Sequence, residues 1–413
     1  MRDQHNKMSK RHGDPSYEDL KAQGYLTDAI LNYVALLGWA PKGEKAESEE
    51  DSGEFDRADD PCRNLSEEEV AANLAAGKPY VIRQRIPHEG TTTFHDVSFG
   101  DITVENKTLD DQVLLKRDGL PTYNFANVVD DHLMGITHVV RGSEYLSSAP
   151  KYNLLYEAFG WEVPTYVHCS PVMRDQHNKM SKRHGDPSYE DLKAQGFLTD
   201  AILNYVALLG WAPKGEYAEQ EIFSLDELVK VFDIAGISKS PAIFDIEKLT
   251  YFNATYLRAM EPAAFAEVAE PYIRQAVKNP AIDAAGIAAL LQARCEKLTD
   301  IPEKVDFFDA LPDYDVEFFT NKKSKTNAEV SKAMLEAAIP ALEAISDWTV
   351  DAIHDTLIDL AAKLEVKNAT LMWPVRIAAA GKLVTPGGAV EICHLLGKDE
   401  TLRRLRLGLD KLN

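Results

Sequence analysis

Cysteine is scarce in this chain of 413 residues: four are present, spaced far apart at Cys62, Cys169, Cys295 and Cys393. None forms a Cys-x-x-Cys pair, so the sequence predicts neither a disulfide framework nor a zinc knuckle. Long apolar runs are also missing, because no stretch approaches the roughly 18–20 residues that cross a membrane. The amino terminus has no apolar secretory core. We therefore expect a cytoplasmic protein with no membrane-bound part.

Positive charge is in deficit, with 45 Lys and Arg against 66 Asp and Glu and a net charge of −21. Because phosphate neutralisation requires Lys and Arg, this balance taken alone argues against nucleic-acid binding. Whole-chain charge is a poor guide to a local surface, however, and basic residues gather in two places. These are Arg174 with Lys179, Lys182 and Arg183, and then Arg403, Arg404 and Arg406. At about 100–200 residues per domain, the length allows two to four domains.

One segment occurs twice, as Met1–Glu49 and Met173–Glu221. The two copies differ at three positions: Tyr25/Phe197, Lys45/Tyr217 and Ser48/Gln220. Repeat architectures need three or more similar units to bury a continuous core, so this is not a solenoid. We interpret it as a recent duplication or as a fault in assembling the sequence. The second copy continues into well-patterned sequence, whereas the first runs into an acidic stretch, so we take the second as native.

Patterns up to residue 159 predict a mixed α/β region. Ser66 and Glu69 form a capping box that starts a helix over Ser66–Ala76. Tyr80–Pro87 alternates as a strand does, and Thr91–Asn106 has the composition of a hairpin broken at Gly100-Asp101.

A β–α–β order follows, which is expected of a parallel sheet. Two short apolar runs, Val113–Lys116 and Thr137–Arg141, flank the helical segment Asn127–Met134. A further helix is predicted over Ala149–Phe159, with Pro150 in its first turn.

From Ser224 onward the patterns are helical. Ser224 and Glu227 form a second capping box. A four-residue set follows helical spacing: Ile353, Leu357, Leu360 and Leu364. Prolines are expected to punctuate the helices at Pro312, Pro340, Pro374 and Pro386. The chain thus changes from α/β to all-α near residues 220–255.

The most informative short motif is Lys-Met-Ser-Lys-Arg, at Lys179–Arg183 and again at Lys7–Arg11. Taken alone, such a motif is more often a solvated basic turn than a site. Its surroundings favour a site. Upstream lies a segment that ends Thr-His-Val-Val-Arg141-Gly-Ser-Glu-Tyr145, and downstream lies Phe244-Asp-Ile-Glu-Lys-Leu-Thr-Tyr-Phe-Asn253.

These segments resemble the glutamyl-tRNA synthetases of bacterial type, which are class I aminoacyl-tRNA synthetases. The pentapeptide resembles their mobile ATP loop, and residues 118–145 closely resemble the second half of their catalytic fold. Phe244–Asn253 resembles their stem-contact region. Ile301–Lys304 and Thr385–Lys398 resemble their helical anticodon-binding domains. The resemblance covers about residues 55–413, and several independent motifs occur in the right order.

The resemblance implies an α/β part followed by an all-α part. The first would be a partial class I Rossmann-type catalytic fold, its second half, with a stem-contact region, and the second a helical anticodon-binding domain. The implied domains are residues 1–50, the duplicated loop segment; 51–117, a partial acceptor-stem domain; 118–255, the half catalytic domain with the loop and stem-contact fold; and 256–413, the anticodon-binding domains.

The resemblance also implies site residues. Tyr123, Asn127 and Arg141 would line the glutamate pocket, and Glu144 and Tyr145 would lie beside the amino acid and the ATP ribose. Lys179, Met180, Ser181, Lys182 and Arg183 would form the ATP loop, in which the two lysines offset the charge that grows as pyrophosphate leaves. Arg294 would read the anticodon, with an ordinary surface arginine as the equally weighted alternative.

Partners follow from the same resemblance: glutamate, ATP with Mg²⁺, and tRNA(Glu), bound by a monomer. No protein-bound metal is expected. Cys62 stands alone, and the adjacent side chains of Asp130, Asp131 and His132 cannot all face one ion, so we assign that run a structural role.

A motif that the family carries is missing from the printed chain. The family has His-Ile-Gly-His at the start of a helix, where the helix N-terminus and the histidines hold the ATP phosphates. We therefore expect this chain to be inactive or nearly so, and half a doubly wound sheet to leave an exposed edge and an uncovered apolar face.

Several alternatives remain beside the ligase. One is a catalytically inactive tRNA-binding fragment, and another is a misassembled record of a normal gene. A glutaminyl-tRNA synthetase is less expected, since its relatives end in β-barrels, and the short glutamyl-queuosine relative lacks an anticodon-binding half. Whether tRNA(Gln) is also charged stays open.

Overall fold

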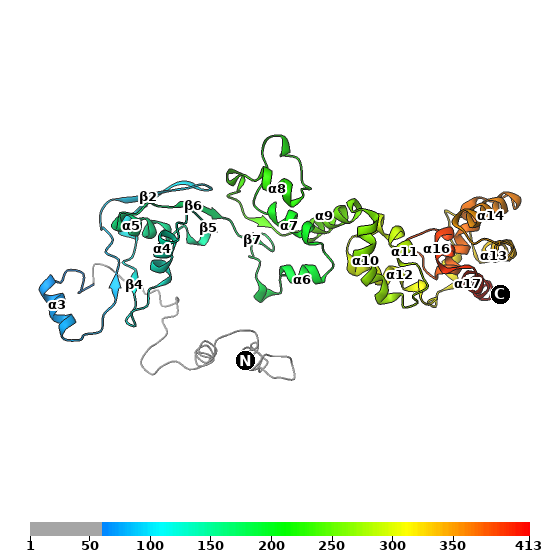
Figure 1. The fold of residues 1–413 in the computed structure, drawn as a ribbon, viewed down its shortest axis with the longest axis horizontal. Helices are drawn as coiled ribbons and strands as arrows, with labels where there is room; N and C mark the ends of the chain where they lie inside the picture. Colours follow the sequence, from blue (N-terminus) through cyan, green and yellow to red (C-terminus); the bar gives the residue numbers. More distant parts are fainter. Residues whose placement is uncertain (1–59) are drawn as a thin grey trace. The chain divides into compact units, whose positions relative to one another are not determined.

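The computed structural model describes residues 60–413 and divides them into two compact units (Figure 1). The first contains residues 60–90 and 105–126, and the second contains residues 91–104 and 127–413. The first copy of the repeat and the start of the expected acceptor-stem domain lie outside the described residues.

The first unit begins with α3 (Glu67–Ala75), which confirms the expected capping box of Ser66 and Glu69. Its other elements are η3 (Asn106–Thr108) and a two-stranded antiparallel sheet of β1 (Ile82–Arg83) and β4 (Val113–Leu115). The prediction of a strand over Tyr80–Pro87 is thus wrong in length. The backbone N–H of Ile86 donates to the Asp111 carboxylate at 3.0 Å rather than to a neighbouring strand.

The predicted β–α–β unit across β4 is also wrong, because β4 and β5 (His138–Gly142) belong to different sheets. The helix between them, α4 (Tyr123–Leu133), begins four residues before the expected Asn127. Parallel pairing occurs one step later along the chain, where β5 and β6 (Thr165–Cys169) flank α5 (Ala149–Phe159). The expectation for α5 is confirmed, with a proline in its first turn and Gly160 in the left-handed conformation at its end.

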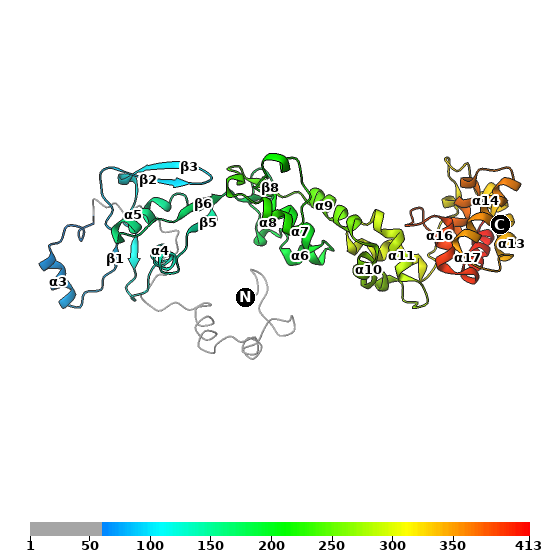
Figure 2. The same ribbon diagram turned by 45° about the horizontal axis from the view of Figure 1, so that its top comes forward.

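The sheet of the second unit has the order β3-β2-β6-β5, and β6 is parallel to both of its neighbours. β2 (Thr91–Asp96) and β3 (Gly100–Glu105) form the expected hairpin (Figure 2). Its turn falls at residues 97–99, before the predicted break at Gly100, because the Asp96 carboxylate accepts from the backbone of Ser98 and Phe99. Ala149 of α5 packs on this sheet against Phe94 and Tyr166.

Strand β5 is an edge strand among the described residues, pairing only with β6. On it, Val140 is 62% exposed. Leu133 and Met134, at the end of α4, are also exposed. These features match the open edge and uncovered apolar face expected from the sequence.

The part around the Lys-Met-Ser-Lys-Arg segment has short strands and helices. β7 (Val172–Met173) pairs in parallel with β8 (Ala242–Ile243), so residues far apart in sequence hold the base of the segment. The remaining elements are η5 (Lys182–His184), α6 (Tyr189–Ala194), α7 (Thr199–Ala207), η6 (Gly215–Tyr217), α8 (Leu225–Val231), η7 (Ile234–Gly236) and α9 (Ile246–Ala259). The expected capping box of Ser224 and Glu227 is confirmed at α8.

The rest of the second unit is helical, as predicted, and shares one large apolar core. Its elements are α10 (Pro262–Ala276), α11 (Ala284–Leu291), η8 (Gln292–Arg294), η9 (Leu298–Asp300), α12 (Ile301–Val305), η10 (Asp306–Phe308), η11 (Val316–Phe319), α13 (Ala328–Glu343), α14 (Val350–Lys363), α15 (Asn368–Ala380), α16 (Ala389–Leu396) and α17 (Lys398–Lys411). Within residues 60–413, no helix is long and apolar enough to cross a membrane.

Two of the four expected helix-breaking prolines do not break a helix. Pro340 lies inside α13 and Pro374 inside α15. A proline inside a helix removes one backbone hydrogen bond at a cost of about 3 kcal/mol. Both helices bury several residues in the common core, and we attribute their continuity to that packing.

Candidate active site

Two of the predicted glutamate-site residues lie where β5 ends. Arg141 is the penultimate residue of β5, and Glu144 follows in η4 (Ser143–Tyr145). In the parallel register Arg141 lies opposite His168, and Gly142 lies opposite Cys169. Open α/β sheets bind ligands at the carboxyl ends of their parallel strands. The sheet therefore places both residues where a ligand site is expected.

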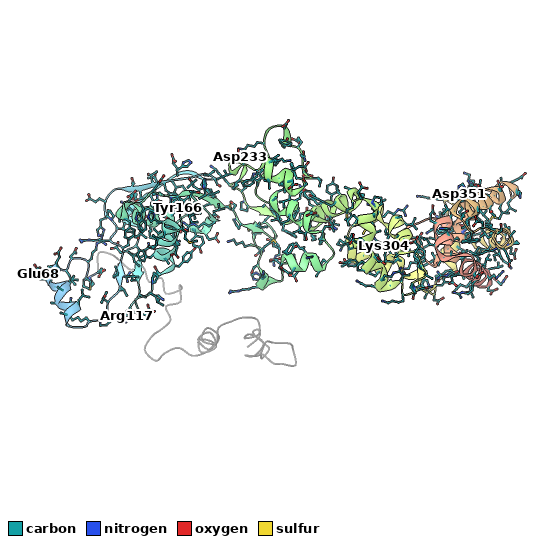
Figure 3. The ribbon with its side chains drawn as sticks, in the orientation of Figure 1. Glu68, Arg117, Tyr166, Asp233, Lys304 and Asp351 are labelled. Atoms are coloured by element: carbon teal, nitrogen blue, oxygen red, sulfur yellow. The ribbon has the colours of Figure 1, made fainter. Side chains whose placement is uncertain are left out.

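Three tyrosine rings surround the guanidinium group of Arg141. Its central carbon lies 4.6 Å from the ring centre of Tyr152, 5.1 Å from that of Tyr145 and 5.7 Å from that of Tyr166. Tyr152 and Tyr166 are both buried, and Tyr166 is labelled in Figure 3. Cation–π contacts of this kind hold a guanidinium in place. Arg141 Nε is buried without a hydrogen-bond partner, so the cage presents a fixed cationic donor, suited to a carboxylate.

Helix α4 carries two further predicted residues. Asn127 belongs to the second unit, and its Oδ1 is buried without a hydrogen-bond partner. Tyr123 is the first residue of α4 and belongs to the first unit, where it is 61% exposed. The second unit thus contains three of the four predicted glutamate-site residues, Asn127, Arg141 and Glu144.

The side chains of the acidic run in α4 have separate neighbours. Burial raises the pKa of Asp131, and the nearby charge of Arg141 partly offsets this effect. His132 instead stacks on Trp161, with ring centres 3.9 Å apart. Residues 60–413 contain no group of three side chains that could hold a metal ion.

A buried, hydrogen-bonded pair of side chains beside Arg141 was not predicted. His168 Nδ1 lies 2.6 Å from Asp96 Oδ2, and both side chains are fully buried. The two residues are 72 positions apart in sequence. A histidine on a strand and an aspartate before a turn carry no local signal of pairing, so only the parallel contact of β2 with β6 reveals it.

The Lys-Met-Ser-Lys-Arg segment begins in a small hairpin. Met173 and Lys179 form an antiparallel bridge, and Met180 N donates to Val172 O at 3.1 Å. The turn between them is organised by Asp175. Hydrogen bonds from the Asn178 side chain and from the backbone of His177 lower the pKa of the Asp175 carboxyl to about 2. The first lysine of the motif is therefore held on an ordered base.

Two hydrogen bonds between residues close in sequence hold the second half of the segment. Ser181 Oγ accepts from Arg183 N at 3.2 Å, and Ser181 N donates to the Asp186 carboxylate at 2.7 Å. Lys182 and Arg183 are exposed and form no ion pair with any residue in the range 60–413. Two cations are thus available to a polyanion from a loop whose backbone is fixed at Ser181.

The two predicted subsites meet at one exposed ion pair. Lys179 Nζ lies 3.5 Å from Glu144 Oε1, and the two side chains are 53% and 55% exposed. A hydrogen bond from its own backbone N–H is the main cause that lowers the pKa of Glu144, and the Lys179 charge adds to it. An exposed pair of this kind contributes about 0–1 kcal/mol, so a ligand can displace it easily.

A cavity of about 640 Å³ lies beside the loop. Lys182 and Asp186 line it from the loop, and Gln195 of the segment after α6 and Phe244, next to β8, line it from the other elements. The exposed side chain of Lys182 is therefore one of the groups that line this open space.

The predicted anticodon-reading residue, Arg294, ends η8. One nitrogen, Nη1, donates to the carbonyl oxygen of Thr385 at 3.1 Å, and the side chain remains exposed. Arg376 donates to the Thr385 hydroxyl at 2.8 Å. Two arginines therefore hold the loop after α15, and Arg294 keeps exposed surface for a partner.

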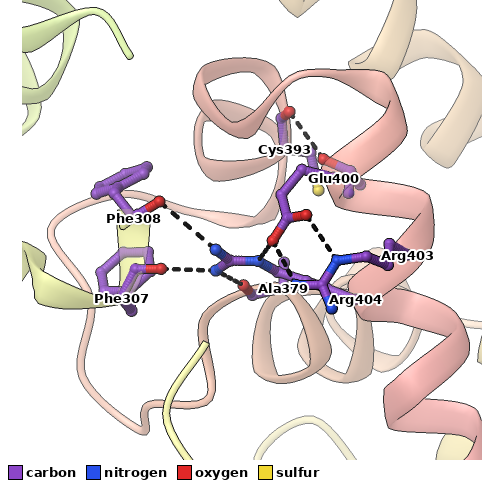
Figure 4. Close-up of polar contacts among 8 residues, drawn as sticks. Phe307, Phe308, Ala379, Cys393, Glu400, Arg403 and Arg404 are labelled. Carbon is purple, nitrogen blue, oxygen red and sulfur yellow. Dashed lines mark hydrogen bonds and ion pairs between the residues drawn. The ribbon is translucent and has the colours of Figure 1, made fainter. Parts of the chain in front are cut away.

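The second basic cluster expected from the sequence is not a free cationic surface. Arg404 is fully buried and donates to the carbonyl oxygens of Phe307 and Ala379 and to the Glu400 carboxylate (Figure 4). Arg403 shares Glu400, and Arg406 pairs with Glu343. Arg403 pairs within its own helix, α17, whereas Arg404 and Arg406 connect α17 to other elements, because carbonyl groups or a carboxylate of those elements lie within reach.

Comparison with known families assigns both halves of the chain. Residues 42–251 match the family described as "tRNA synthetases class I (E and Q), catalytic domain", and residues 264–409 match "Anticodon binding domain". Glutamate–tRNA ligase of Clostridium tetani is 54% identical over 366 residues, which is 89% of this chain and 74% of the relative. The ligase of Clostridium acetobutylicum is 55% identical over 351 residues, 85% of this chain and 72% of the relative.

Solved structures give the same result. A glutamate–tRNA ligase from Elizabethkingia meningosepticum, solved in complex with its amino acid, matches with a TM-score of 0.74 at 31% identity over 84% of this chain and 72% of its own. The enzyme from Elizabethkingia anophelis matches with a TM-score of 0.73 at 32% identity, over 84% of this chain and 71% of its own. The fold, the order of its parts and these relatives together show that this chain belongs to the glutamate–tRNA ligases, a family of class I aminoacyl-tRNA synthetases.

Proposed function

We propose that the chain binds glutamate and ATP at the carboxyl ends of β5 and β6 and passes the activated amino acid to tRNA(Glu). The side-chain carboxylate of glutamate pairs with Arg141. Tyr123, Asn127 and Glu144 complete the amino-acid site. The observation that carries this proposal is the caged guanidinium of Arg141, whose buried Nε has no hydrogen-bond partner within the described part of the chain. A fixed bidentate donor recognises a carboxylate better than an amide.

The ATP site in this proposal consists of Tyr145 and the loop of Lys179, Met180, Ser181, Lys182 and Arg183. An α-carboxylate oxygen of glutamate attacks the α-phosphorus of ATP, and pyrophosphate leaves with the bonding electrons. The 3′-terminal hydroxyl of the tRNA then attacks the carbonyl carbon of this adenylate. An ester bond forms, AMP leaves with the bonding electrons, and the hydroxyl gives up its proton. Lys179 and Lys182 neutralise charge on the departing phosphates, an interaction that grows towards the transition state and so raises the rate.

The substrates define the remaining parts of the proposal. Mg²⁺ enters bound to the ATP phosphates, which is its usual mode in nucleotide sites. The helical residues 256–413 bind the anticodon arm, with exposed Arg294 as a base-reading group, because a planar guanidinium can pair with a base edge. Residues 51–117 act as a partial acceptor-stem domain, and residues 118–255 carry the chemistry. We further propose a monomer in the cytoplasm.

The two loop copies have different roles in this proposal. The second copy is the functional one, since the structure ties it to β7 and β8 and to Glu144. The first copy, Met1–Glu49, is a duplicated appendage.

A tRNA-binding fragment without activity is the second candidate, favoured only by the missing motif. Identity above 50% along most of the chain favours the ligase. The test is aminoacylation with purified chain, MgATP, labelled glutamate and tRNA(Glu), with glutamine as the control amino acid. We expect charging with glutamate and none with glutamine. No charging, with tRNA still retained in a filter assay, would leave the fragment as the function.

A further inference from the structure

The buried pair of Asp96 and His168 has a polar atom left over. Asp96 Oδ2 accepts from His168 Nδ1 at 2.6 Å and from His168 N at 3.0 Å, while Oδ1 accepts from Ser98 N and Phe99 N. The carboxylate is thus fully used. His168 Nε2, in contrast, is buried without any hydrogen-bond partner among residues 60–413. A buried polar atom left unpaired costs about 1–3 kcal/mol, so it calls for an explanation.

Asp96 fixes which nitrogen of His168 carries the proton. A carboxylate can only accept, so His168 Nδ1 must be the donor in their contact. In the neutral ring Nε2 is then an acceptor with a free lone pair. The pair therefore offers the site an oriented acceptor.

The position of His168 puts that acceptor on the face of the sheet that holds Arg141. His168 is the penultimate residue of β6 and lies in register opposite Arg141, the penultimate residue of β5. Side chains in register on neighbouring strands point to the same face, and residues two apart on one strand do as well. Tyr166, two residues before His168, contacts the Arg141 guanidinium, which confirms the shared face.

Three further buried polar atoms of the second unit have no hydrogen-bond partner among the described residues. Asn127 Oδ1 on α4 and Asn153 Oδ1 on α5 are buried acceptors without partners, and Arg141 Nε is a buried donor without one. One cationic donor beside several acceptors matches a zwitterion. A carboxylate would satisfy the donor, and an ammonium group, which has three N–H bonds and no lone pair, would satisfy acceptors.

From this arrangement we infer that the Asp96–His168 pair is a further part of the amino-acid site, in which His168 Nε2 accepts a hydrogen bond from the α-ammonium group of the bound amino acid. This inference rests on the proposed function, since it assigns a contact within the glutamate site. Its consequence is selection for an amino group: glutarate, which has the same two carboxylates and no ammonium, leaves Nε2 unpaired and binds more weakly.

The test compares glutamate with glutarate on the full chain, with and without tRNA(Glu). Wild type is expected to prefer glutamate by about tenfold or more, as for a hydrogen bond to a charged group. His168→Asn removes the oriented acceptor and lowers this ratio towards one. Asp96→Asn preserves shape but can donate to Nδ1, which moves the ring proton to Nε2, and it lowers the ratio as well. Circular dichroism checks that both variants fold.

A second measurement follows binding in the unsubstituted chain. In chain labelled with ¹⁵N-histidine, the signals absent from His168→Asn identify His168. We expect a protonated Nδ1, a bare Nε2, and a shift of Nε2 on adding glutamate but not glutarate. One outcome would overturn the inference and leave the proposed function standing. In it, wild type binds glutamate and Arg141→Ala does not, but the preference for glutamate over glutarate is unchanged in His168→Asn and Asp96→Asn, and the Nε2 signal does not shift. Wild type that binds neither acid would overturn both.

Discussion

Lys179 Nζ lies 3.5 Å from Glu144 Oε1, and this contact joins the residue proposed for ATP to one proposed for glutamate. Glu144 comes directly after β5, whereas Lys179 lies on the loop that follows β7. Because both side chains are about half exposed, the pair is weak and Lys179 can exchange Glu144 for a phosphate group. The two subsites thus share one displaceable contact.

Replacement of Glu144 separates stability from function. We expect Glu144→Gln to change the free energy of unfolding by less than about 1 kcal/mol, because the pair is exposed, but to lower kcat/KM for aminoacylation. Glu221→Gln is the matched control, since Glu221 forms a comparable exposed pair with Lys248. Urea unfolding and initial charging rates measure the two effects. Equal rates for both variants would remove Glu144 from the site.

The duplicated segment supplies an internal control for the loop lysines. Lys179→Ala and Lys182→Ala should each lower kcat by about 10²-fold with a smaller change in KM for ATP, since they act mainly on developing charge. Lys7→Ala and Lys10→Ala make the same change in the first copy and should leave kcat unaltered. A loss of activity in the first-copy variants would show that our choice of native copy is wrong.

Local patterns predicted the elements that local contacts determine. Capping boxes at Ser66 and Ser224 and the proline in the first turn of α5 fix helix starts within a few residues, and all three are present. The caged Arg141 and the ATP loop came from motif resemblance. The structure places Arg141 at a strand end and the loop after β7.

Non-local contacts account for the errors. The side chain of Asp111 accepts a hydrogen bond from the backbone N–H of Ile86. This contact ends a strand that the alternation of apolar and polar residues alone would continue. β4 pairs with β1 rather than joining β5, a choice that no short segment encodes. The pairing of Asp96 with His168 needs β2 and β6 side by side. Likewise, the sequence alone predicts a surface position for Arg404, and only the packing of the helices buries it.

Arg404 should be a major stabilising residue of the helical part. Arg404→Ala leaves the carbonyl groups of Phe307 and Ala379 without their donor, and we expect a loss of about 3–5 kcal/mol, as for other buried charges that lose a partner. Arg403→Ala, which removes an exposed partner of the same Glu400, should cost less than about 1 kcal/mol. Chemical denaturation followed by circular dichroism measures both. Equal small losses would contradict the packing role.

Acid should destabilise the same region through Glu400. Hydrogen bonds from Arg403 and then Arg404 lower the pKa of Glu400 from 4.5 to about 2. A carboxyl with a lowered folded-state pKa stabilises the protein fully above its unfolded value, and this contribution is lost as the pH falls from about 4.5 towards about 2. Unfolding free energies measured from about pH 6 to about pH 3 should therefore fall less steeply in Glu400→Gln than in wild type. Identical slopes would contradict the assignment.

The role of Arg141 is the central claim, and charging of tRNA(Glu) with glutamate by wild type and Arg141→Ala tests it most directly. We predict charging by wild type, a loss of about 10²-fold or more in the variant from the missing ion pair, and unchanged retention of tRNA on a filter. Equal charging by the two proteins would contradict the account, as would a wild-type chain that retains tRNA but never charges it.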